Sequence, residues 1–173
     1  AYENSRVTKV GDYAFAYCSK LTTVSFPNAT SIGAYVFRSC TSLTTASFPN
    51  VTSIGNYAFV YCTSLTTASF PNVTSIGGSA FASCTSLTTA SFPNVTSIGS
   101  SAFSNCTHLE SFYVLASSVA TLSGSNVFLN TPMSKSSYLG YFGSIYVPAS
   151  LVDSYKSKVY WSAYSARITA YEG

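Results

Sequence analysis

The sequence predicts a repeat solenoid, because a 22-residue unit recurs through most of the first 110 residues. The unit, represented by Thr52–Val73, joins a run of alternating residues to a run with helical spacing. Stacked units bury a shared core, and 47% of the 173 residues are hydrophobic. The period appears in cysteines (Cys18, Cys40, Cys62, Cys84, Cys106), phenylalanines (Phe15, Phe37, Phe59, Phe81, Phe103) and leucines (Leu21, Leu43, Leu65, Leu87, Leu109).

The first half of the unit predicts a strand. Apolar and polar residues alternate over 65–70, so Ala68 and Phe70 point inward while Thr67 and Ser69 point outward. The Pro-Asn pair that follows ends the strand. Each strand is expected to pair in parallel with its counterpart one coil away. The expected strands lie near 22–26, 44–48, 66–70, 88–92 and 110–114.

The second half of the unit predicts one short helical or 3-10 turn. Ala58 and Cys62 are four residues apart, and Phe59 and Cys62 are three apart, which places them on one helical face. Gly55 recurs before this turn, and we expect it to supply either a positive φ or a close-packed corner.

The period breaks after Leu115. Residues 8–115 are five regular repeats, 116–148 form an irregular sixth repeat with a loop inserted near 134–143, and 149–173 form a cap. A sixth strand is expected at Ile145–Val147, and a capping helix at Leu151–Lys158 with Ser150 as its N-cap. Trp161, Tyr164 and Ile168 are expected to cover the last coil. We expect 1–173 to be one domain, with no comparable N-terminal cap and further sequence upstream.

Composition excludes several classes of function. Charged residues make up only 8% of the chain and the net charge is +3, too sparse for nucleic-acid binding. There is no apolar run of 18 residues, so no membrane insertion is expected. The five cysteines are an odd number and lack zinc-ligand spacing, so we interpret them as buried free thiols. No cofactor is implied. The Ser-, Thr- and Asn-rich surface favours an extracellular location.

The motifs resemble a known family. The pattern Leu-x-x-Ala-x-Phe-Pro with Ser-Ile-Gly-x-x-Ala-Phe-x-x-Cys-x-x-Leu is similar to the BspA-like, Treponema pallidum-type leucine-rich repeat. The resemblance implies an α/β solenoid with a parallel sheet on its concave face and short turns on its convex face. It also implies a bacterial secreted or cell-surface protein that adheres to host proteins or other cells. Ala replaces the middle Leu in three repeats, and the sixth repeat lacks its Cys.

Two stretches are candidate binding sites. The outward residues of the predicted concave sheet are Thr45, Ser47, Thr67, Ser69, Thr89, Ser91, Ser111 and Tyr113, and the inserted loop adds Tyr138, Tyr141 and Phe142. Such hydroxyls could instead be merely well-solvated strand residues, and the loop could pack against the cap. A row of convex-face tyrosines (Tyr13, Tyr35, Tyr57, with Tyr17 and Tyr61 nearby) is either an interface or a ladder stacked on itself.

The sequence offers no catalytic set. His108 is the only histidine, and no carboxylate pair or nucleophile with a base can be proposed. We therefore expect a non-enzymatic, cell-surface or secreted binding and adhesion module that recognises an extracellular protein or glycan, including one from a host. The alternative is a structural spacer that presents another domain.

Overall fold

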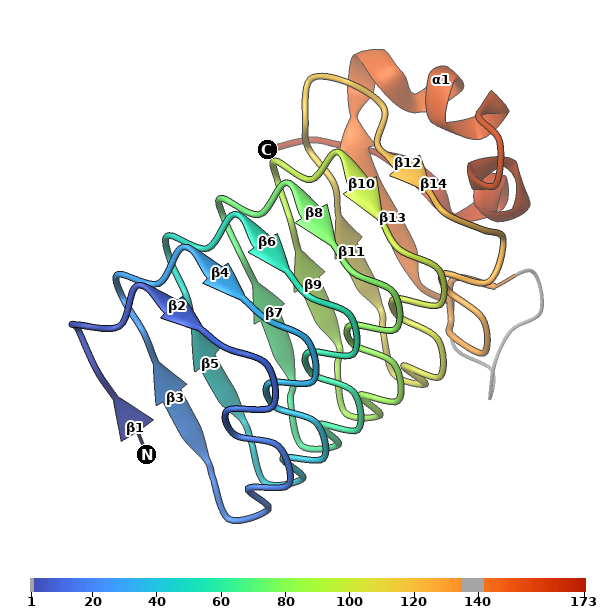
Figure 1. Ribbon diagram of the computed structural model, residues 1–173. Helices are drawn as coiled ribbons and strands as arrows, with labels where there is room; N and C mark the ends of the chain where they lie inside the picture. Colours follow the sequence, from blue (N-terminus) through green and yellow to red (C-terminus); the bar gives the residue numbers. More distant parts are fainter. Residues whose placement is uncertain (1, 135–141) are drawn as a thin grey trace.

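The computed structural model describes residues 2–134 and 142–173 and shows a stack of parallel coils. Each coil contributes a short strand to one side and a longer strand to the other, joined by turns (Figure 1). The short-strand face consists of β2 (Lys9–Val10), β4 (Ser31–Ile32), β6 (Ser53–Ile54), β8 (Ser75–Ile76), β10 (Ser97–Ile98) and β12 (Thr121–Leu122). The long-strand face consists of β1 (Tyr2–Glu3), β3 (Thr23–Ser25), β5 (Thr45–Ser47), β7 (Thr67–Ser69), β9 (Thr89–Ser91), β11 (Ser111–Tyr113), β13 (Ser144–Pro148) and β14 (Ile168–Tyr171).

The long strands confirm the predicted solenoid. Except between β5 and β7, they pair in parallel and in register with the repeat, so that Thr67 faces Thr89 and Ser69 faces Ser91. The predicted sixth strand is β13, which pairs with β11. The chain adds two long strands that the pattern did not predict, since β1 pairs with β3 and β14 pairs with β13.

Phenylalanine ladders fill the core. Phe59 stacks on Phe81 with centroids 5.0 Å apart, and Phe70 stacks on Phe92 at 5.5 Å. The two ladders meet edge to face, as in the Phe59–Phe70 pair at 60°. Both geometries are favourable for aromatic quadrupoles. The inward-pointing residues are therefore as predicted, and each coil buries its apolar face against the next.

The short-strand face was not predicted. Its strands fall where the sequence indicated only a corner before Gly55. A Cβ on Gly55 would lie 2.5 Å from the backbone of Gly33, so adjacent coils approach too closely for any side chain. Of the two roles expected for this glycine, the close-packed corner is confirmed. The positive φ values belong to other residues.

The predicted helical turns form hydrogen-bonded turns instead of a helix. Tyr57 and Tyr61 have φ values of 58° and 61°, in the left-handed region that interrupts a right-handed helix. Their N–H groups point along the solenoid and donate to the next coil, at Gly78 and Ala82. The intervening Val60 N–H instead donates back to Tyr57 within its own coil. The N–H groups of the turn therefore donate either to the next coil or within their own coil. These two kinds of bond satisfy the backbone N–H groups without any helical segment in residues 2–134.

Side chains add further hydrogen bonds between coils. The turn residue Asn72 donates from Nδ2 to the Pro49 carbonyl at 2.7 Å, and Thr74 donates to the Thr52 carbonyl at 3.2 Å. The same bonds recur in neighbouring repeats, at Asn50, Asn94, Thr52 and Thr96. Repetition of these residues is therefore structural: each Asn satisfies a proline carbonyl of the preceding coil, and each Thr adds a second bond to a carbonyl that already accepts its own N–H.

The cysteines are free thiols, as predicted, but the prediction that all five are buried is wrong for Cys18. Cys40, Cys62, Cys84 and Cys106 are buried, whereas Cys18 in the first regular repeat is exposed. The buried thiols fill the core as small apolar groups and also donate to a carbonyl oxygen.

Strand pairing on the long-strand face is interrupted between β5 and β7. β5 belongs to the sheet β1-β3-β5 and β7 to the sheet β14-β13-β11-β9-β7, although the two strands are neighbours. Ala46 is partly exposed there, whereas the equivalent Ala68 is buried. The coils therefore separate slightly on this side only.

The C-terminal segment covers the last coil. It contains η1 (Ala149–Leu151), α1 (Val152–Ser157) and η2 (Trp161–Arg167) before β14. The predicted helix is confirmed, but the predicted N-cap is wrong: Leu151 holds the N-cap position and no side chain caps the helix. Trp161 is fully buried, and its Nε1 donates to the Ala120 carbonyl at 2.7 Å. No described helix is long and apolar enough to cross a membrane.

Candidate binding faces

The long-strand face carries two columns of hydroxyl groups. Parallel register places equivalent residues of successive coils beside one another, about 4.8 Å apart. These outward residues, exposed or half-buried, are Thr45, Ser47, Thr67, Ser69, Thr89, Ser91, Ser111 and Tyr113. The structure thus brings all of the predicted sheet residues together on one surface.

These hydroxyls form no side-chain hydrogen bonds within the described part of the chain. Immediately before β5 and β9, by contrast, the threonine hydroxyl is hydrogen-bonded: Thr88 donates to the Thr66 carbonyl at 3.2 Å, and Thr44 to the Thr22 carbonyl at 3.1 Å. The difference arises because Thr44 and Thr88 lie beside a carbonyl of the preceding coil, whereas the strand hydroxyls point to solvent. The outward hydroxyls are therefore available to a ligand.

The hydroxyl columns end at a cluster of tyrosines. Tyr113 takes the position of Ser91 in the register, and its ring stacks on that of Tyr146 with centroids 4.7 Å apart. Tyr171 meets Tyr113 edge-on at 5.8 Å and is 43% exposed. Aromatic side chains of this kind are the usual anchors of binding surfaces, because they bury a large area with little loss of conformational entropy.

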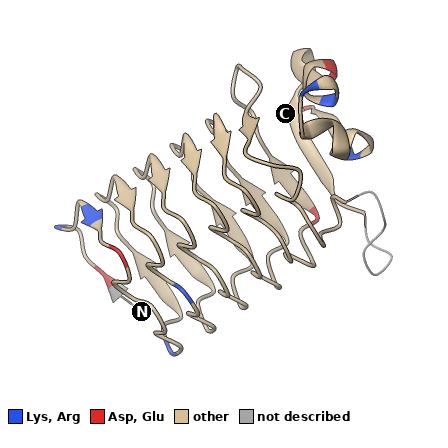
Figure 2. Ribbon diagram, turned by 45° about the vertical axis from the view of Figure 1, so that its right-hand side comes forward, with Lys and Arg blue, Asp and Glu red and all other residues tan. Residues whose placement is uncertain are grey.

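The face is electrically neutral over most of its length. The outward residues of β5, β7, β9 and β11 are all uncharged, and these strands are tan throughout in Figure 2. A ligand on this surface would be held by hydrogen bonds and aromatic contact and not by ion pairs.

The inserted loop gives only one described candidate residue. Tyr138 and Tyr141 lie outside the described residues. Phe142 is 61% exposed, and the guanidinium carbon of Arg167 lies 4.2 Å from the centre of its ring. Since Arg167 belongs to η2, this contact favours packing of Phe142 against the cap over an independent binding loop.

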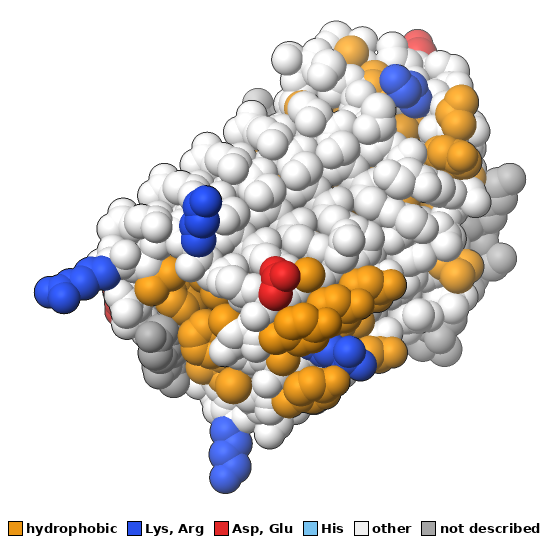
Figure 3. All heavy atoms as spheres, viewed as in Figure 1, with side chains coloured by type: hydrophobic (Ala, Val, Ile, Leu, Met, Phe, Trp, Pro, Cys, Tyr) orange, Lys and Arg blue, Asp and Glu red, His pale blue; other side chains and the backbone are white. Residues whose placement is uncertain are grey.

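A second exposed surface lies over the turns of the N-terminal coils. Tyr13 stacks on Tyr35, and Tyr35 on Tyr57, each with ring centroids 4.8 Å apart. Tyr13 is 55% exposed and Tyr57 38%, so the row is at once a stacked ladder and a free surface. Figure 3 shows hydrophobic side chains gathered on the lower part of the molecule, with a basic side chain among them.

Arg38 lies on this second surface and was not predicted from the sequence as a site residue. Its guanidinium carbon lies 5.3 Å from the centre of the Tyr17 ring and 5.6 Å from that of Tyr35. A sequence signal was present: Arg38 is the only charged side chain between Leu21 and Thr107.

The single histidine has a structural role. Nδ1 of His108 lies 2.7 Å from the Thr85 carbonyl oxygen, so this nitrogen carries the proton. Ser64 makes the equivalent bond to the Thr41 carbonyl at 2.6 Å, and His108 therefore continues a bond of the repeat. Among the described residues, no three His, Cys, Asp or Glu side chains lie together as a metal site.

A parallel stack of 22-residue coils, each with a three-residue strand followed by a Pro-Asn turn, defines the chain as a leucine-rich repeat solenoid. A model of the BspA-type leucine-rich repeat region, with six copies, matches residues 4–137. The chain belongs to the BspA-type leucine-rich repeat family.

Solved structures of similar proteins come from bacteria. A leucine-rich repeat protein of Treponema pallidum is 27% identical over 60% of this chain and 61% of its own, with a TM-score of 0.51. One from Bacteroides ovatus is 32% identical over 61% of this chain and 28% of its own, with a TM-score of 0.52.

A leucine-rich cell surface protein of Faecalibacterium prausnitzii is 27% identical over 82% of this chain and 43% of its own, with a TM-score of 0.51. The chain therefore spans less than two thirds of each of these three proteins. No curated protein sequence matches the chain.

Proposed function

We propose that this chain is a non-enzymatic binding and adhesion module that acts at the cell surface or after secretion. Its ligand is an extracellular protein or glycan, bound on the long-strand face. The observation that carries the proposal is the pair of unoccupied hydroxyl columns that lead into the cluster of Tyr113, Tyr146 and Tyr171. The cell-surface description of the Faecalibacterium protein supports the location.

The geometry suits a ligand rich in hydrogen-bonding groups. Each coil presents the same donors and acceptors at one strand spacing, so a ligand can make many weak contacts along the columns. Identical contacts give little specificity by themselves. The tyrosine cluster breaks the repetition, and its rings offer the large contact area that dominates binding energy in known interfaces.

The second candidate function is a spacer that holds another domain away from the cell. The near-identity of the regular repeats favours it, because specific recognition usually depends on varied side chains. The two functions differ at the tyrosine cluster, which a spacer does not need.

The test is a binding screen of the purified chain against extracellular matrix proteins and glycans. We expect saturable binding to at least one of them. The variant Tyr113→Ser, which restores the serine found at Ser91, should weaken it about tenfold or more. Tyr13→Ser, which restores the serine found at Ser79 and Ser101, is the matched control and should bind normally. Absence of saturable binding would favour the spacer, whereas saturable binding that Tyr113→Ser leaves unchanged would place the ligand away from the tyrosine cluster.

A further inference from the structure

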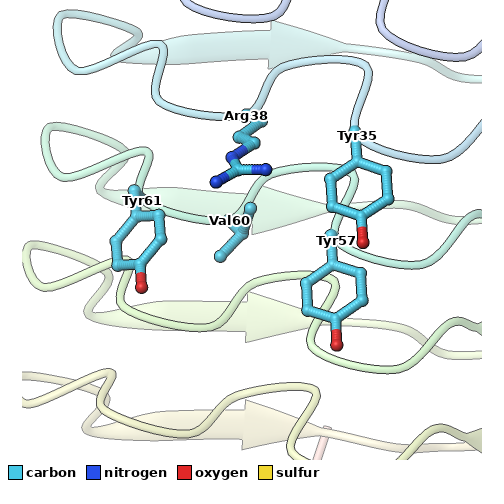
Figure 4. A pocket seen from close by; sticks show the side chains of 5 residues that line it. All are labelled: Tyr35, Arg38, Tyr57, Val60 and Tyr61. Carbon is cyan, nitrogen blue, oxygen red and sulfur yellow. The ribbon is translucent and has the colours of Figure 1, made fainter.

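The turns of the N-terminal coils enclose a hollow, separate from the long-strand face. It measures about 270 Å³ and is lined by Tyr35, Arg38, Tyr57, Val60 and Tyr61. Figure 4 shows Arg38 between Tyr61 on one side and the Tyr35–Tyr57 pair on the other, with Val60 beside it. The hollow exists because the repeat departs from its pattern here, since the positions of Tyr57 and Tyr61 carry Ser79 and Ser83 one coil later.

Backbone geometry holds the tyrosine walls in place. Tyr35, Tyr57 and Tyr61 all have positive φ, at 56°, 58° and 61°. Their N–H groups donate to the following coil, at 3.0 Å from Tyr35 to Asn56 and 3.0 Å from Tyr61 to Ala82. The side chains therefore project from a backbone that is hydrogen-bonded to the following coil, and the walls are formed before any ligand binds. A preformed site loses less entropy on binding.

The Arg38 side chain is held by contacts with aromatic rings and not by hydrogen bonds to acceptor atoms. It lies against Tyr17 and Tyr35 within the range of cation–π attraction. Its Nε is buried without a hydrogen-bond partner among the described residues. The guanidinium extends into the hollow (Figure 4). Among the described residues, no hydrogen bond or ion pair joins it to a carboxylate. The side chain thus presents a positive charge that forms no ion pair with any described residue.

The position of Arg38 has no structural need for a charge. Equivalent positions in other coils hold Ala16, Val60, Ala82 and Ser104. A planar guanidinium stacked on an aromatic ring is well suited to bind a carboxylate through two parallel hydrogen bonds.

We propose that this hollow binds a sugar residue that bears one carboxylate, such as a uronic or sialic acid at the end of a glycan. The carboxylate pairs with the terminal nitrogens of Arg38. The apolar C–H face of the sugar ring lies against the tyrosine walls, and its hydroxyls bond to the phenol oxygens of Tyr57 and Tyr61, which border the hollow.

A single sugar acid fits these residues better than a polyanion does. Nucleic acids and heavily sulfated chains need several cations along their length, whereas Arg38 is the only charge between Leu21 and Thr107. A strongly acidic peptide also needs more than one cation. One carboxylate on a ring with many hydroxyls matches one guanidinium among aromatic rings and phenols.

The test is a titration of the purified chain, followed by NMR, with glucuronic acid, galacturonic acid and N-acetylneuraminic acid. Glucose and galactose are the neutral counterparts, and a short glutamate-rich peptide is the acidic control. We expect saturable binding of at least one sugar acid and much weaker binding of the neutral sugars and the peptide.

Variants locate the site. Arg38→Ala restores the residue found at Ala16 and Ala82, so it should fold normally and weaken binding by about 10- to 100-fold. Arg38→Lys keeps the charge but loses the flat stacked group, and it should be intermediate. Tyr61→Ser, which matches Ser39 and Ser83, should also weaken binding. Lys156→Ala removes one exposed charge elsewhere and should bind normally.

Three results would overturn the proposal. Equal binding of neutral and acidic sugars would remove the role of the carboxylate. Unchanged binding by Arg38→Ala would place the ligand elsewhere. Tighter binding of the peptide than of any sugar acid would assign the hollow to acidic proteins. None of these results bears on Tyr113, so the long-strand face is tested separately.

Discussion

The thiol of Cys84 donates a hydrogen bond to the carbonyl oxygen of Phe59, 3.2 Å away and one coil earlier. The same oxygen accepts from the N–H of Cys62 at 3.1 Å. Alanine could fill a similar volume but could not donate, and serine would bring a more polar group into the core. Cysteine therefore recurs because it is small, largely apolar and still able to donate.

We predict that the protein loses stability above about pH 9. Burial raises the pKa of the Cys40 thiol from 9.0 to about 11 and that of Cys106 to about 12. Unfolded thiols release their protons near pH 9 while folded thiols keep them, so the free energy of unfolding falls as pH rises through this window. Each thiol contributes up to about 1.4 kcal/mol per pH unit. Urea unfolding at pH 8, 9 and 10 measures this slope.

Cys84→Ala is the control for that titration. Burial raises the pKa of this thiol as well, so its removal should make the slope between pH 8 and 10 less steep. An equal midpoint of urea unfolding at pH 8 and pH 10 in the unsubstituted protein would contradict the assignment of this pH dependence to the buried thiols.

Alkylation should separate Cys18 from the other cysteines. Cys18 is exposed, whereas the remaining four are buried and their thiolates are disfavoured by desolvation. Iodoacetamide at pH 8 should therefore add one group to the native protein and five after denaturation, as measured by intact mass. Rapid native modification of Cys62 or Cys84 would show that the coils open more readily than the packed core implies.

Gly55→Ala should be strongly destabilising. The new Cβ would lie 2.5 Å from the backbone of Gly33, and two backbones cannot move apart without breaking the short-strand pairing. Overpacking of this kind costs about 1–3 kcal/mol or more. Gly78→Ala is the matched control, because its Cβ would meet nothing nearer than 3.5 Å. The midpoint of thermal unfolding should fall for Gly55→Ala and not for Gly78→Ala. Equal midpoints for the two variants would contradict the close approach of Gly55 to the backbone of Gly33.

Ser79→Gly should stabilise the protein. Ser79 has a φ of 52°, a conformation that costs an ordinary residue about 1 kcal/mol and glycine little. The gain is partly offset because glycine is more flexible in the unfolded chain. Ser75→Gly in β8 is the opposite control and should destabilise, since glycine weakens a strand. A lower melting temperature for Ser79→Gly than for the parent protein would argue against the left-handed turn.

The long-strand half of each coil was predictable because its signal is local. Alternation over 65–70, ended by Pro-Asn, determines which side chains point inward. The short strands were missed because a two-residue strand such as Ser75–Ile76 is too short to show a period. The turns were missed because positive φ at Tyr57 is stabilised by a hydrogen bond to Gly78 in another coil, which no local pattern reveals.

The candidate surfaces were predictable to different degrees. The columns that contain Thr67 and Ser69 follow from strand alternation. A sequence does not show, however, that the side-chain hydroxyl of Thr88 is hydrogen-bonded while that of its neighbour Thr89 is not. Tyr146 was placed on a strand, yet its stacking on Tyr113 depends on the register across the irregular repeat. Binding by either surface stays a prediction. The assignment of residues 1–173 to one domain also stays a prediction.

Removal of the cap should destabilise the whole stack, and Trp161 is the residue that tests this. Its ring contacts Tyr155 edge-on at 5.0 Å and Phe128 at 6.2 Å, which closes the end of the phenylalanine ladder. Trp161→Ala should cost about 3–5 kcal/mol, because it leaves a large cavity and exposes that ladder to solvent. The exposed end should also promote association, visible as a concentration-dependent mass in light scattering.

Trp161→Phe separates packing from hydrogen bonding. It keeps most of the ring but leaves the Ala120 carbonyl without its donor, at an expected cost of about 1–3 kcal/mol. The midpoint of thermal unfolding should therefore fall in the order parent, Trp161→Phe, Trp161→Ala. If Trp161→Ala melted like the parent protein and stayed monomeric, the last coil would be stable without cover, and the C-terminal segment would not act as a cap.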